Sequence, residues 1–559
     1  MTGRKKPGAE LVLLPMGGMG EIGMNAYAYG LGTAAKRKWI LVDCGVKFGD
    51  ERDPGIDLIL PDVSYLENQA KNLLGIFLTH GHEDHIGGIA WLWPQLRCPV
   101  YCTPFAAELV KRKLAEAGLL GEVPLRVVPV GGTVEVGGFS VEYVSVTHSI
   151  PEPAALAIRT AAGTIVHSGD WKLDPTPTIP PLMDIDRFRQ IGDEGVDVLV
   201  CDSTNVLREG HSPSESEISE NLAQIMSQAK GRVAITTFAS HVGRITSIAQ
   251  AARANGREVV VAGRAMHNII AAAREVGLLK EGNSFRDQTE YGYLPRDKVV
   301  LLCTGSQGEP RAAMARIAAD NHPDITLDKD DLVIFSSKTI PGNEKSVGEL
   351  LNKLARQHVE VITSDDALVH TSGHPRQDEL RQFYGWVKPK LLVPMHGEAR
   401  HLLKQTEFAV ECGIPETATV MAGQILRLAP GGAEIIDEVP GGRMHVDGRI
   451  IVSSVEGPAR KRRKLAQVGV VAVSLVIDGS GRMVDDPQAV LDGLPEETEA
   501  GYEFFELVLD IVEEVFESIP RKRRQVDEVV EEKLRQSIRR RVDTEWGKRP
   551  IVHVLIHRV

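Results

Sequence analysis

The chain has 559 residues, of which 43% are apolar and 25% charged, a composition typical of a globular protein with several domains. Its net charge of −12 argues against binding to nucleic acid through bulk charge, although it permits a local basic channel. No apolar run approaches the ~18 residues of a membrane span, and the short basic N-terminus lacks the apolar core of a signal peptide. Six dispersed cysteines without a CxxC pair indicate reduced thiols, so we expect a cytoplasmic protein that does not contact a membrane.

The first part of the chain, residues 1–213, alternates short apolar runs with glycine turns. Residues 11–45 predict antiparallel strands, and a helix near 63–71 precedes the apolar run Leu73 to Leu78. Later apolar runs in this part end at polar residues, namely His148, Asp170 and the segment Asp202 to Asn205. In layered α/β proteins the loops that carry the site collect at such strand ends, so these residues are candidates for a functional site.

The pattern changes at residue 214, where strand-helix repeats begin. They predict a separate parallel-sheet domain over residues 214–360. Polar strand ends return afterwards, so we expect residues 361–452 to complete the first domain around this insertion. The remaining residues divide into a basic linker, 453–466, and a small C-terminal α/β domain, 467–559.

Four side chains with metal-binding groups follow the apolar run Leu73 to Leu78: His80, His82, Asp84 and His85. Imidazole and carboxylate groups suit zinc or manganese. The four are too close in sequence to enclose one metal, so the motif predicts further ligands later in the chain. A surface loop with chance histidines is the alternative, but three histidines in six positions are improbable in a chain with 17.

Two residues at later strand ends extend this motif. Taken alone, His148 also suits a solvated or capping histidine, and Asp170 a turn aspartate. Their order after the His-x-His-x-Asp-His pattern resembles the metallo-β-lactamase superfamily, whose αββα sandwich holds two metals bridged by a carboxylate. The resemblance implies one metal on His80, His82 and His148, a second on Asp84 and His85, Asp170 as the bridge, and His396 as the last ligand.

A narrower resemblance follows from the long interval between Asp170 and His396. With Asp202 and His374 in order, the interval resembles the β-CASP subgroup of nucleic-acid-processing nucleases. Within that subgroup, the segments at 17–25, 202–205, 369–374 and 394–398 resemble the bacterial ribonuclease J family, over essentially the whole chain. This implies a metallo-β-lactamase αββα sandwich with an inserted β-CASP parallel α/β domain and a small C-terminal α/β domain.

The resemblance also implies an activity. We expect a metal-dependent ribonuclease with two Zn²⁺ per chain, Mn²⁺ or Mg²⁺ being alternatives, that hydrolyses RNA phosphodiesters. The family acts chiefly as a 5′→3′ exonuclease on 5′-monophosphate RNA, with endonuclease activity in addition, in mRNA turnover and rRNA maturation. The expected partners are RNA, further copies of the chain in a homodimer or homotetramer through the C-terminal domain, and an RNA-degradation complex.

Three residues are candidates for catalysis: Asp84, Asp202 and His374. His374 has no obvious place among the metal ligands and could donate a proton to the leaving 3′ oxygen. Asp202 could orient a ligand histidine, as carboxylates behind metal ligands do. A helix-capping histidine and an N-cap aspartate are the alternatives.

A phosphate pocket is a weaker prediction. The turn at His370, Ser372 and Gly373 offers a hydroxyl, backbone amides and an imidazole, which suit the RNA 5′ phosphate. Ser240 and His241 are the candidates from the inserted domain, with ordinary turn residues as the alternative. The Gly-rich loop 304–310 lacks the lysine of a P-loop and is interpreted as a structural turn.

Two competing functions remain open at this point. A thioesterase or lactonase could use the same metal core, but a small ester needs no inserted domain. A non-catalytic RNA-binding or scaffold subunit is the other alternative, although the ligand set shows no loss that would favour it. Basic runs at 460–464, 521–524 and 539–541 could contact RNA or face solvent.

Overall fold

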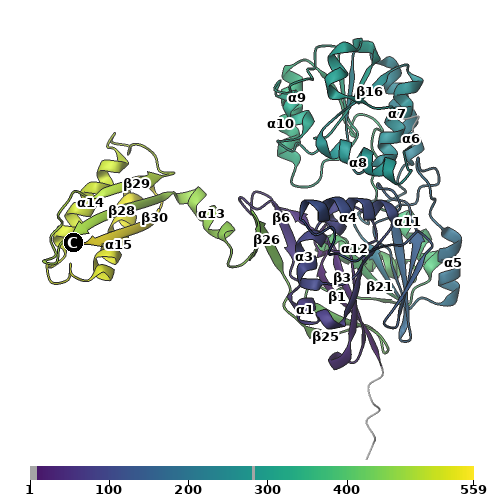
Figure 1. The fold of residues 1–559 in the computed structure, drawn as a ribbon, viewed down its shortest axis with the longest axis horizontal. Coiled ribbons are helices and arrows are strands. Elements are labelled where there is room, and N and C mark those ends of the chain that lie inside the picture. The colour runs from purple at the N-terminus through teal and green to yellow at the C-terminus, as the bar shows by residue number, and fades with distance from the viewer. Residues whose placement is uncertain (1–8, 280–283) are drawn as a thin grey trace, which may run out of the picture. The chain divides into compact units, whose positions relative to one another are not determined.

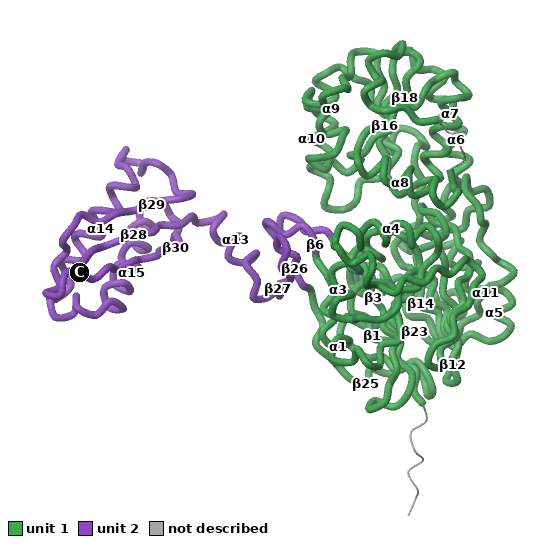
Figure 2. Tube along the Cα trace, viewed as in Figure 1, with its two compact units in different colours: residues 1–47, 59–443 green, residues 48–58, 444–559 purple. Residues whose placement is uncertain are grey.

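The computed structural model describes residues 9–279 and 284–559. They divide into two compact units, residues 1–47 with 59–443 and residues 48–58 with 444–559, which are described separately below (Figures 1 and 2). In the part of the chain that the structure describes, no helix is both long and apolar enough to cross a membrane.

Two mixed sheets form the two central layers of unit 1. One has the strand order β25 (Glu434–Glu438), β24 (Gln424–Ala429), β1 (Glu10–Gly17), β3 (Ala26–Gly32), β4 (Lys38–Val42), β7 (Leu73–Phe77), β8 (Val100–Cys102) and β9 (Leu125–Val127). The other has the order β10 (Thr133–Val136), β11 (Phe139–Ser145), β12 (Ala154–Thr160), β13 (Gly163–His167), β14 (Val198–Asp202), β21 (Leu391–Met395) and β23 (Glu416–Thr417). Strands β1, β3 and β4 are antiparallel, as expected for residues 11–45.

The core lies between these sheets because alternate side chains of each strand point inward. Leu11, Tyr29 and Ile40 from the first sheet belong to the same buried cluster as Tyr143 and Leu156 from the second. The outer face of the second sheet is covered by the helices α5 (Ile185–Glu194), α11 (Gln377–Val387) and α12 (Ala399–Glu411). On the other flank lie α1 (Ser64–Asn68), α3 (Ile89–Leu96) and α4 (Pro104–Glu116), which completes the αββα sandwich (Figure 1).

The inserted domain has one parallel sheet, as the strand-helix repeats predict. Its strand order is β17 (Arg286–Asp287), β16 (Glu258–Ala262), β18 (Val299–Cys303), β15 (Val233–Thr236), β19 (Leu332–Phe335) and β20 (Glu360–Ile362). One face packs on α6 (Glu215–Gln228), α7 (Val242–Ala254) and α8 (Arg264–Glu275), and the other on α9 (Ala313–Ala318) and α10 (Glu344–Arg356). Because β20 pairs with β19, this sheet runs two residues past the expected boundary at 360.

Unit 2 contains the small C-terminal α/β domain. Its sheet has the order β29 (Gln488–Asp492), β28 (Val470–Ile477) and β30 (Ile551–Arg558), and β28 alternates half-buried and buried residues. The buried face packs on α14 (Phe504–Ser518) and α15 (Asp527–Trp546). The expected basic linker, 453–466, is largely helical, because α13 (Pro458–Val468) runs through its basic residues after the hairpin β26 (Arg443–Asp447) and β27 (Ile450–Ser453).

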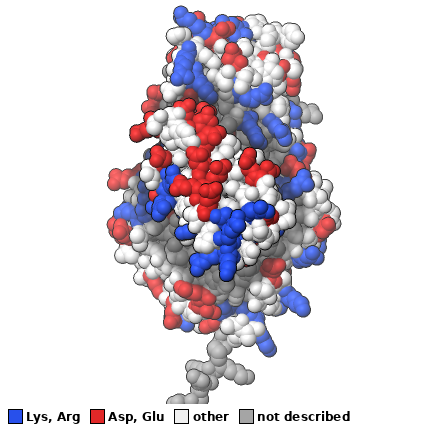
Figure 3. Space-filling view, turned by 90° about the vertical axis from the view of Figure 1, so that its left-hand side faces the viewer, with Lys and Arg blue, Asp and Glu red and all other residues white. Residues whose placement is uncertain are grey.

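Charged side chains of both signs share the surface. The face drawn in Figure 3 carries a connected group of Asp and Glu at its centre, with Lys and Arg in smaller groups around it. This agrees with the net charge of −12 and with the expectation that any RNA contact depends on local basic groups.

Candidate active site

Three histidines form the first group of the site. His80 follows β7, His82 is the N-cap of the short helix α2 (Glu83–Ile86), and His148 follows β11. His82 Nδ1 lies 3.1 Å from His80 Nε2 and 3.1 Å from His148 Nε2. Nitrogen ligands on one tetrahedral zinc ion are about 3.3 Å apart, given bonds of about 2.0–2.1 Å. The three ring nitrogens therefore fit a single ion.

A second group lies beside the first and consists of Asp84, His85, Asp170 and His396. Asp84 Oδ2 is 3.1 Å from His396 Nε2 and 3.6 Å from His85 Nε2. Asp170 Oδ2 is 3.1 Å from His85 Nε2 and 3.9 Å from His148 Nε2, so this carboxylate stands between the two groups. Asp170 Oδ1 is buried and accepts no hydrogen bond from any described residue, although His396 Nδ1 lies 3.2 Å from it, which suits two ligand atoms of one metal.

The outward nitrogen of three ligand histidines has its own partner. Nδ1 of His80 lies 2.9 Å from Thr79 Oγ1, that of His148 2.6 Å from the carbonyl oxygen of Gly373, and that of His85 2.8 Å from Asp43 Oδ2. Such contacts fix the ring orientation and leave Nε2 directed at the metal. The donor set and its supports thus fit two divalent ions, and the His and Asp clusters form a divalent metal site.

The protonation of the first group favours metal binding, since only a neutral imidazole can be a ligand. Burial, and to a lesser degree neighbouring histidines, lowers the pKa of His80 and His148 well below the ordinary value. Burial also lowers the pKa of His82, to about 4. These three side chains are therefore neutral at neutral pH.

Asp43 is a site residue that the sequence analysis did not assign, although it stands at the end of β4. It adopts φ +60°, and its Oδ1 accepts hydrogen bonds from the backbone N (2.8 Å) and Oγ1 (3.1 Å) of Thr79. Because it also contacts His85, Asp43 ties the metal loop to the neighbouring strand. A carboxylate at a strand end was the available signal, but a lone aspartate is too common to stand out.

Parallel pairing in the second sheet brings distant ligands together. Strand β14 pairs with β13 on one side and with β21 on the other, with Asp202 opposite Met395. The carboxyl ends of parallel strands meet at one edge of a sheet, so Asp170, Asp202 and His396 become neighbours. His396 takes φ +52°, which turns its side chain into the cluster directly after the strand.

His374 stands beside the metal ligands and is held by Asp202. Its Nδ1 lies 2.7 Å from Asp202 Oδ2 and 3.9 Å from Asp170 Oδ2, while no described residue hydrogen-bonds to its Nε2. Burial alone would lower the pKa of His374, but the charge of Asp202 and the hydrogen bond to it outweigh burial and raise that pKa. The arrangement can keep a proton on a ring that faces the site.

The five predicted phosphate-pocket residues are placed differently from one another. Ser372 Oγ accepts a hydrogen bond of 2.8 Å from Asn205 Nδ2. Gly373 lies against His148, where an added Cβ would come within 2.6 Å of its ring. His370 has a buried Nδ1 without a hydrogen-bond partner among the described residues, and Ser240 is half-buried.

Both ring nitrogens of His241 already have partners within the protein. Nδ1 accepts a hydrogen bond from the backbone N of Arg244, and Nε2 lies 3.0 Å from Glu215 Oε1. Arg244 bonds the same carboxylate through Nε and Nη2, each at 3.0 Å, and donates to the carbonyl oxygen of Val369 at 3.1 Å. This buried ionic cluster joins the inserted domain to the segment before His370, and no sequence motif predicted it.

Three cationic side chains gather near the His374 loop. Burial, followed by the charge of Arg208, lowers the pKa of Lys338, with a smaller contribution from Arg376. The backbone supports this grouping, since Gln377 N donates to the carbonyl oxygen of Arg208. Asp365 also lies near Lys338, and its charge partly offsets the effect of the two arginines on that pKa.

Comparison with known families covers most of the chain. Matching models describe a beta-lactamase superfamily domain (residues 38–237), a ribonuclease J beta-CASP domain (230–354), a Zn-dependent metallo-hydrolase RNA specificity domain (360–415) and a ribonuclease J C-terminal domain (459–559). A protein named ribonuclease J from Sinorhizobium meliloti is 50% identical over 550 residues, which are 98% of each chain. This chain belongs to the ribonuclease J family.

Other relatives support the assignment. Ribonuclease J of Mycolicibacterium smegmatis is 39% identical over 87% of each chain, and that of Corynebacterium glutamicum is 34% identical over 98% of this chain and 76% of its own. A solved structure of a protein of unknown function from Enterococcus faecalis V583 shares the fold, with a TM-score of 0.53, 16% identity, and coverage of 75% of this chain and 100% of that chain. The expected family, fold class and metal-dependent ribonuclease are confirmed, whereas the role of each site residue stays a prediction.

Proposed function

We propose that this ribonuclease J family member acts chiefly as a 5′→3′ exonuclease on 5′-monophosphate RNA, and that it also cleaves internally. The observation that carries the proposal is the His374–Asp202 pair beside a complete set of seven ligands, which are His80, His82, Asp84, His85, His148, Asp170 and His396. A clustered metal shell with a proton donor at its edge is the equipment that phosphodiester hydrolysis needs.

The chain's own groups divide the chemistry between them. When bound, two divalent ions would supply an activated water and neutralise charge on the reacting phosphate. Asp202 holds Nδ1 of His374, so that Nε2 can donate its proton to the leaving 3′ oxygen. Asp84, whose side chain is 31% exposed, is the carboxylate of the shell that is open to incoming water and substrate.

We propose two zinc ions per chain, with manganese or magnesium as alternatives. Five histidines among seven ligands favour zinc over magnesium, which prefers oxygen ligands. Metal analysis of the purified chain, with and without substitution of Asp84, measures identity and stoichiometry. Two equivalents of zinc are expected, and a single equivalent would contradict the two-ion assignment.

Selection of a 5′ phosphate is assigned to the turn His370–His374 with Ser240. The hydroxyl of Ser372, the backbone at Gly373 and the unpartnered ring nitrogen of His370 suit a phosphate. His241 enters this proposal as the residue that supports the pocket through Glu215.

The deciding experiment compares one RNA with a 5′ hydroxyl, a 5′ monophosphate and a 5′ triphosphate, labelled at its 5′ end. Release of labelled mononucleotide from the monophosphate form alone is expected. Equal release from all three forms would overturn the end selectivity, and internal fragments without mononucleotide would overturn the exonuclease assignment. Thioesters and lactones assayed in parallel test the alternative of a small-ester hydrolase, and activity on those alone would reject an RNA substrate.

Assembly and location complete the proposal. We propose a homodimer or homotetramer formed through the C-terminal domain, residues 467–559, where Val490 and Leu555 are exposed apolar side chains of the sheet. The boundaries 213/214 and 452/453 are proposed as domain limits, and the expected limit at 360/361 is moved to 362/363 so that β20 belongs to the inserted domain. Six free cysteines, five of them buried, support a cytoplasmic enzyme, which we propose works in mRNA turnover, rRNA maturation and an RNA-degradation complex. Light scattering of the full chain and of a variant with charged residues at Val490 and Leu555 tests the oligomer.

A further inference from the structure

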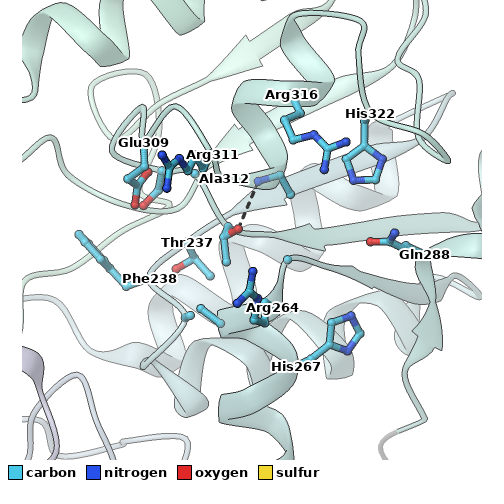
Figure 4. Close-up of a pocket in the computed structure, with 17 residues that line it drawn as sticks. Thr237, Phe238, Arg264, His267, Gln288, Glu309, Arg311, Ala312, Arg316 and His322 are labelled. Carbon is cyan, nitrogen blue, oxygen red and sulfur yellow. Dashed lines mark hydrogen bonds between the residues drawn. The ribbon is translucent and has the colours of Figure 1, made fainter. Parts of the chain in front are cut away.

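A cavity of about 490 Å³ lies in the inserted domain, away from the metal ligands. It opens at the carboxyl ends of β15, β16 and β18, and the loops after these strands line it (Figure 4). None of the seven ligands and neither His374 nor Asp202 belongs to its lining. Its size is in the range of about 300–1,000 Å³ that ligand pockets occupy.

The topology of the sheet explains why a cavity forms there. From β15 the chain crosses β18 to reach β16, and from β18 it crosses β15 to reach β19. The connections after two neighbouring strands therefore leave in opposite directions, which opens a crevice between their loops. Ligands of parallel α/β sheets bind at such switch points.

Three arginines surround this crevice: Arg264, Arg311 and Arg316. Arg264 begins α8, Arg311 precedes α9, and Arg316 lies in the last turn of α9. None of the three hydrogen-bonds or forms an ion pair with a described residue. Arg244 and Arg286 of the same domain bond carboxylates, whereas the three cavity arginines are exposed and have no carboxylate partner among the described residues. Three guanidinium groups around one cavity favour an anion between them.

The only carboxylate among the described lining residues is Glu309, whose Oε2 accepts a hydrogen bond from the backbone N of Gln307. The loop after β16 contributes backbone as well, because Gly263, at φ +104°, precedes α8, whose first amides have no side-chain cap. A Cβ at Gly263 would approach Thr304 Oγ1 to 2.4 Å, so the two loops can close around the cavity only with glycine there. Free amides beside free guanidinium groups suit the oxygens of a phosphate.

We propose that this cavity is a second phosphate-binding site, which takes a nucleotide phosphate through Arg264, Arg311 and Arg316, with Phe238 as an apolar wall. The phosphate can belong to an RNA strand or to a free mononucleotide. Binding at the cavity is independent of the proposed direction of cleavage. Its link to RNA rests on the proposed function.

The test measures binding by the full chain in the presence of a chelator, so that RNA stays intact. One arm titrates uridine 5′-monophosphate, and the other titrates oligoribonucleotides of increasing length. Arg264→Gln, Arg311→Gln and Arg316→Gln are each expected to weaken binding about tenfold, since hydrogen bonds between charged groups are the strong ones. For RNA, each substitution also lowers the slope of log affinity against log salt by ~0.7.

Arg356→Gln is the matched control. Arg356 is an exposed arginine of the same domain, on α10, has no described partner and lies outside the cavity. Weaker binding of both ligands by the cavity variants identifies a nucleotide site, and weaker binding of RNA alone identifies an RNA backbone site. Unchanged binding in all three variants, or an equal loss in the control, would overturn the proposal.

A separate measurement keeps the two proposals apart. Cleavage of a dinucleotide too short to span both sites is expected to be unchanged in the three arginine variants and lost in Asp84→Ala. Loss of dinucleotide cleavage in the arginine variants would place them in the reaction itself and would contradict a separate site.

Discussion

The metal cluster and the inserted-domain cavity both lie at the carboxyl ends of parallel strands, yet they hold their polar side chains in opposite ways. In the cluster, the outward nitrogens of His80, His85 and His148 each have a partner within 2.9 Å. In the cavity, three arginines have no described partner. Bond cleavage requires reacting groups at fixed positions, whereas binding to a phosphate backbone of any sequence needs charge more than fixed geometry.

The largest effect is expected at the metal cluster. Asp170→Ala removes the carboxylate between the two metal groups and should lower kcat by at least about a thousandfold, because several kcal/mol of charge stabilisation disappear. Single-turnover cleavage of a labelled RNA measures the loss, and a chelator should reproduce it in the unsubstituted chain. Asp186→Ala, at an exposed position on α5, is the control, and residual cleavage above about 10% in Asp170→Ala would remove Asp170 from the metal shell.

The next effect concerns the proton donor. His374→Ala should lower kcat by about 10²–10⁴ with little change in KM, since a general acid acts in the transition state. Metal content should stay at the unsubstituted level. A variant that loses its metals instead would show that His374 is a ligand.

The pH profile tests how Asp202 acts. A general acid must be protonated, and the raised pKa of His374 extends the protonated form to higher pH, so kcat should fall only as pH rises through that pKa. Asp202→Asn removes the charge that raises the pKa, and this alkaline fall should move to lower pH. An unchanged profile in Asp202→Asn would leave Asp202 without a role in proton transfer.

A smaller effect is expected for a residue that supports a metal ligand without binding the metal. Asp43→Asn keeps the shape but weakens the support of His85, and should reduce metal affinity or activity about 10–100-fold. Competition with a fluorescent chelator measures the affinity. Added zinc should restore most of the activity, and failure of rescue would indicate that the fold itself is damaged.

The smallest effect on cleavage is expected at the inserted-domain cavity. Arg264→Gln alone should raise KM for long RNA by about tenfold at low salt and leave kcat unchanged, because it removes binding that is equal in the ground state and the transition state. The difference should shrink as salt screens the charges. A fall in kcat equal to the rise in KM would place the cavity in the chemical step and would erase the contrast between the two sites.

Sequence patterns predicted the elements whose signal is local. The motif from His80 to His85 and the polar ends of β13, β14 and β21 identify the site, because parallel strands bring their carboxyl ends together. Strand-helix repeats likewise predicted the inserted sheet. Its last strand, β20, was attributed to the first domain, since pairing with β19 cannot be recognised from three residues.

Features that depend on packing were missed. The cluster of Glu215, His241 and Arg244 forms because α6 and α7 lie side by side, and no spacing in the sequence encodes that contact. The contact of His241 with a carboxylate was therefore not foreseen, and its role at a phosphate pocket stays a prediction. The cavity was missed for a similar reason, since Gly263 and Thr304 become neighbours only in the folded sheet.

The pairing of β14 with β21 also sets the order in which the enzyme can become active during synthesis. Residues 198–202 cannot pair with residues 391–395 until the latter have been synthesised, and the inserted domain lies between them in the chain. Until His396 has emerged from the ribosome, the nascent protein has neither its last metal ligand nor the strand that positions it. We expect an RNA-cutting enzyme built in this way to be inert toward its own messenger until most of that messenger has been translated.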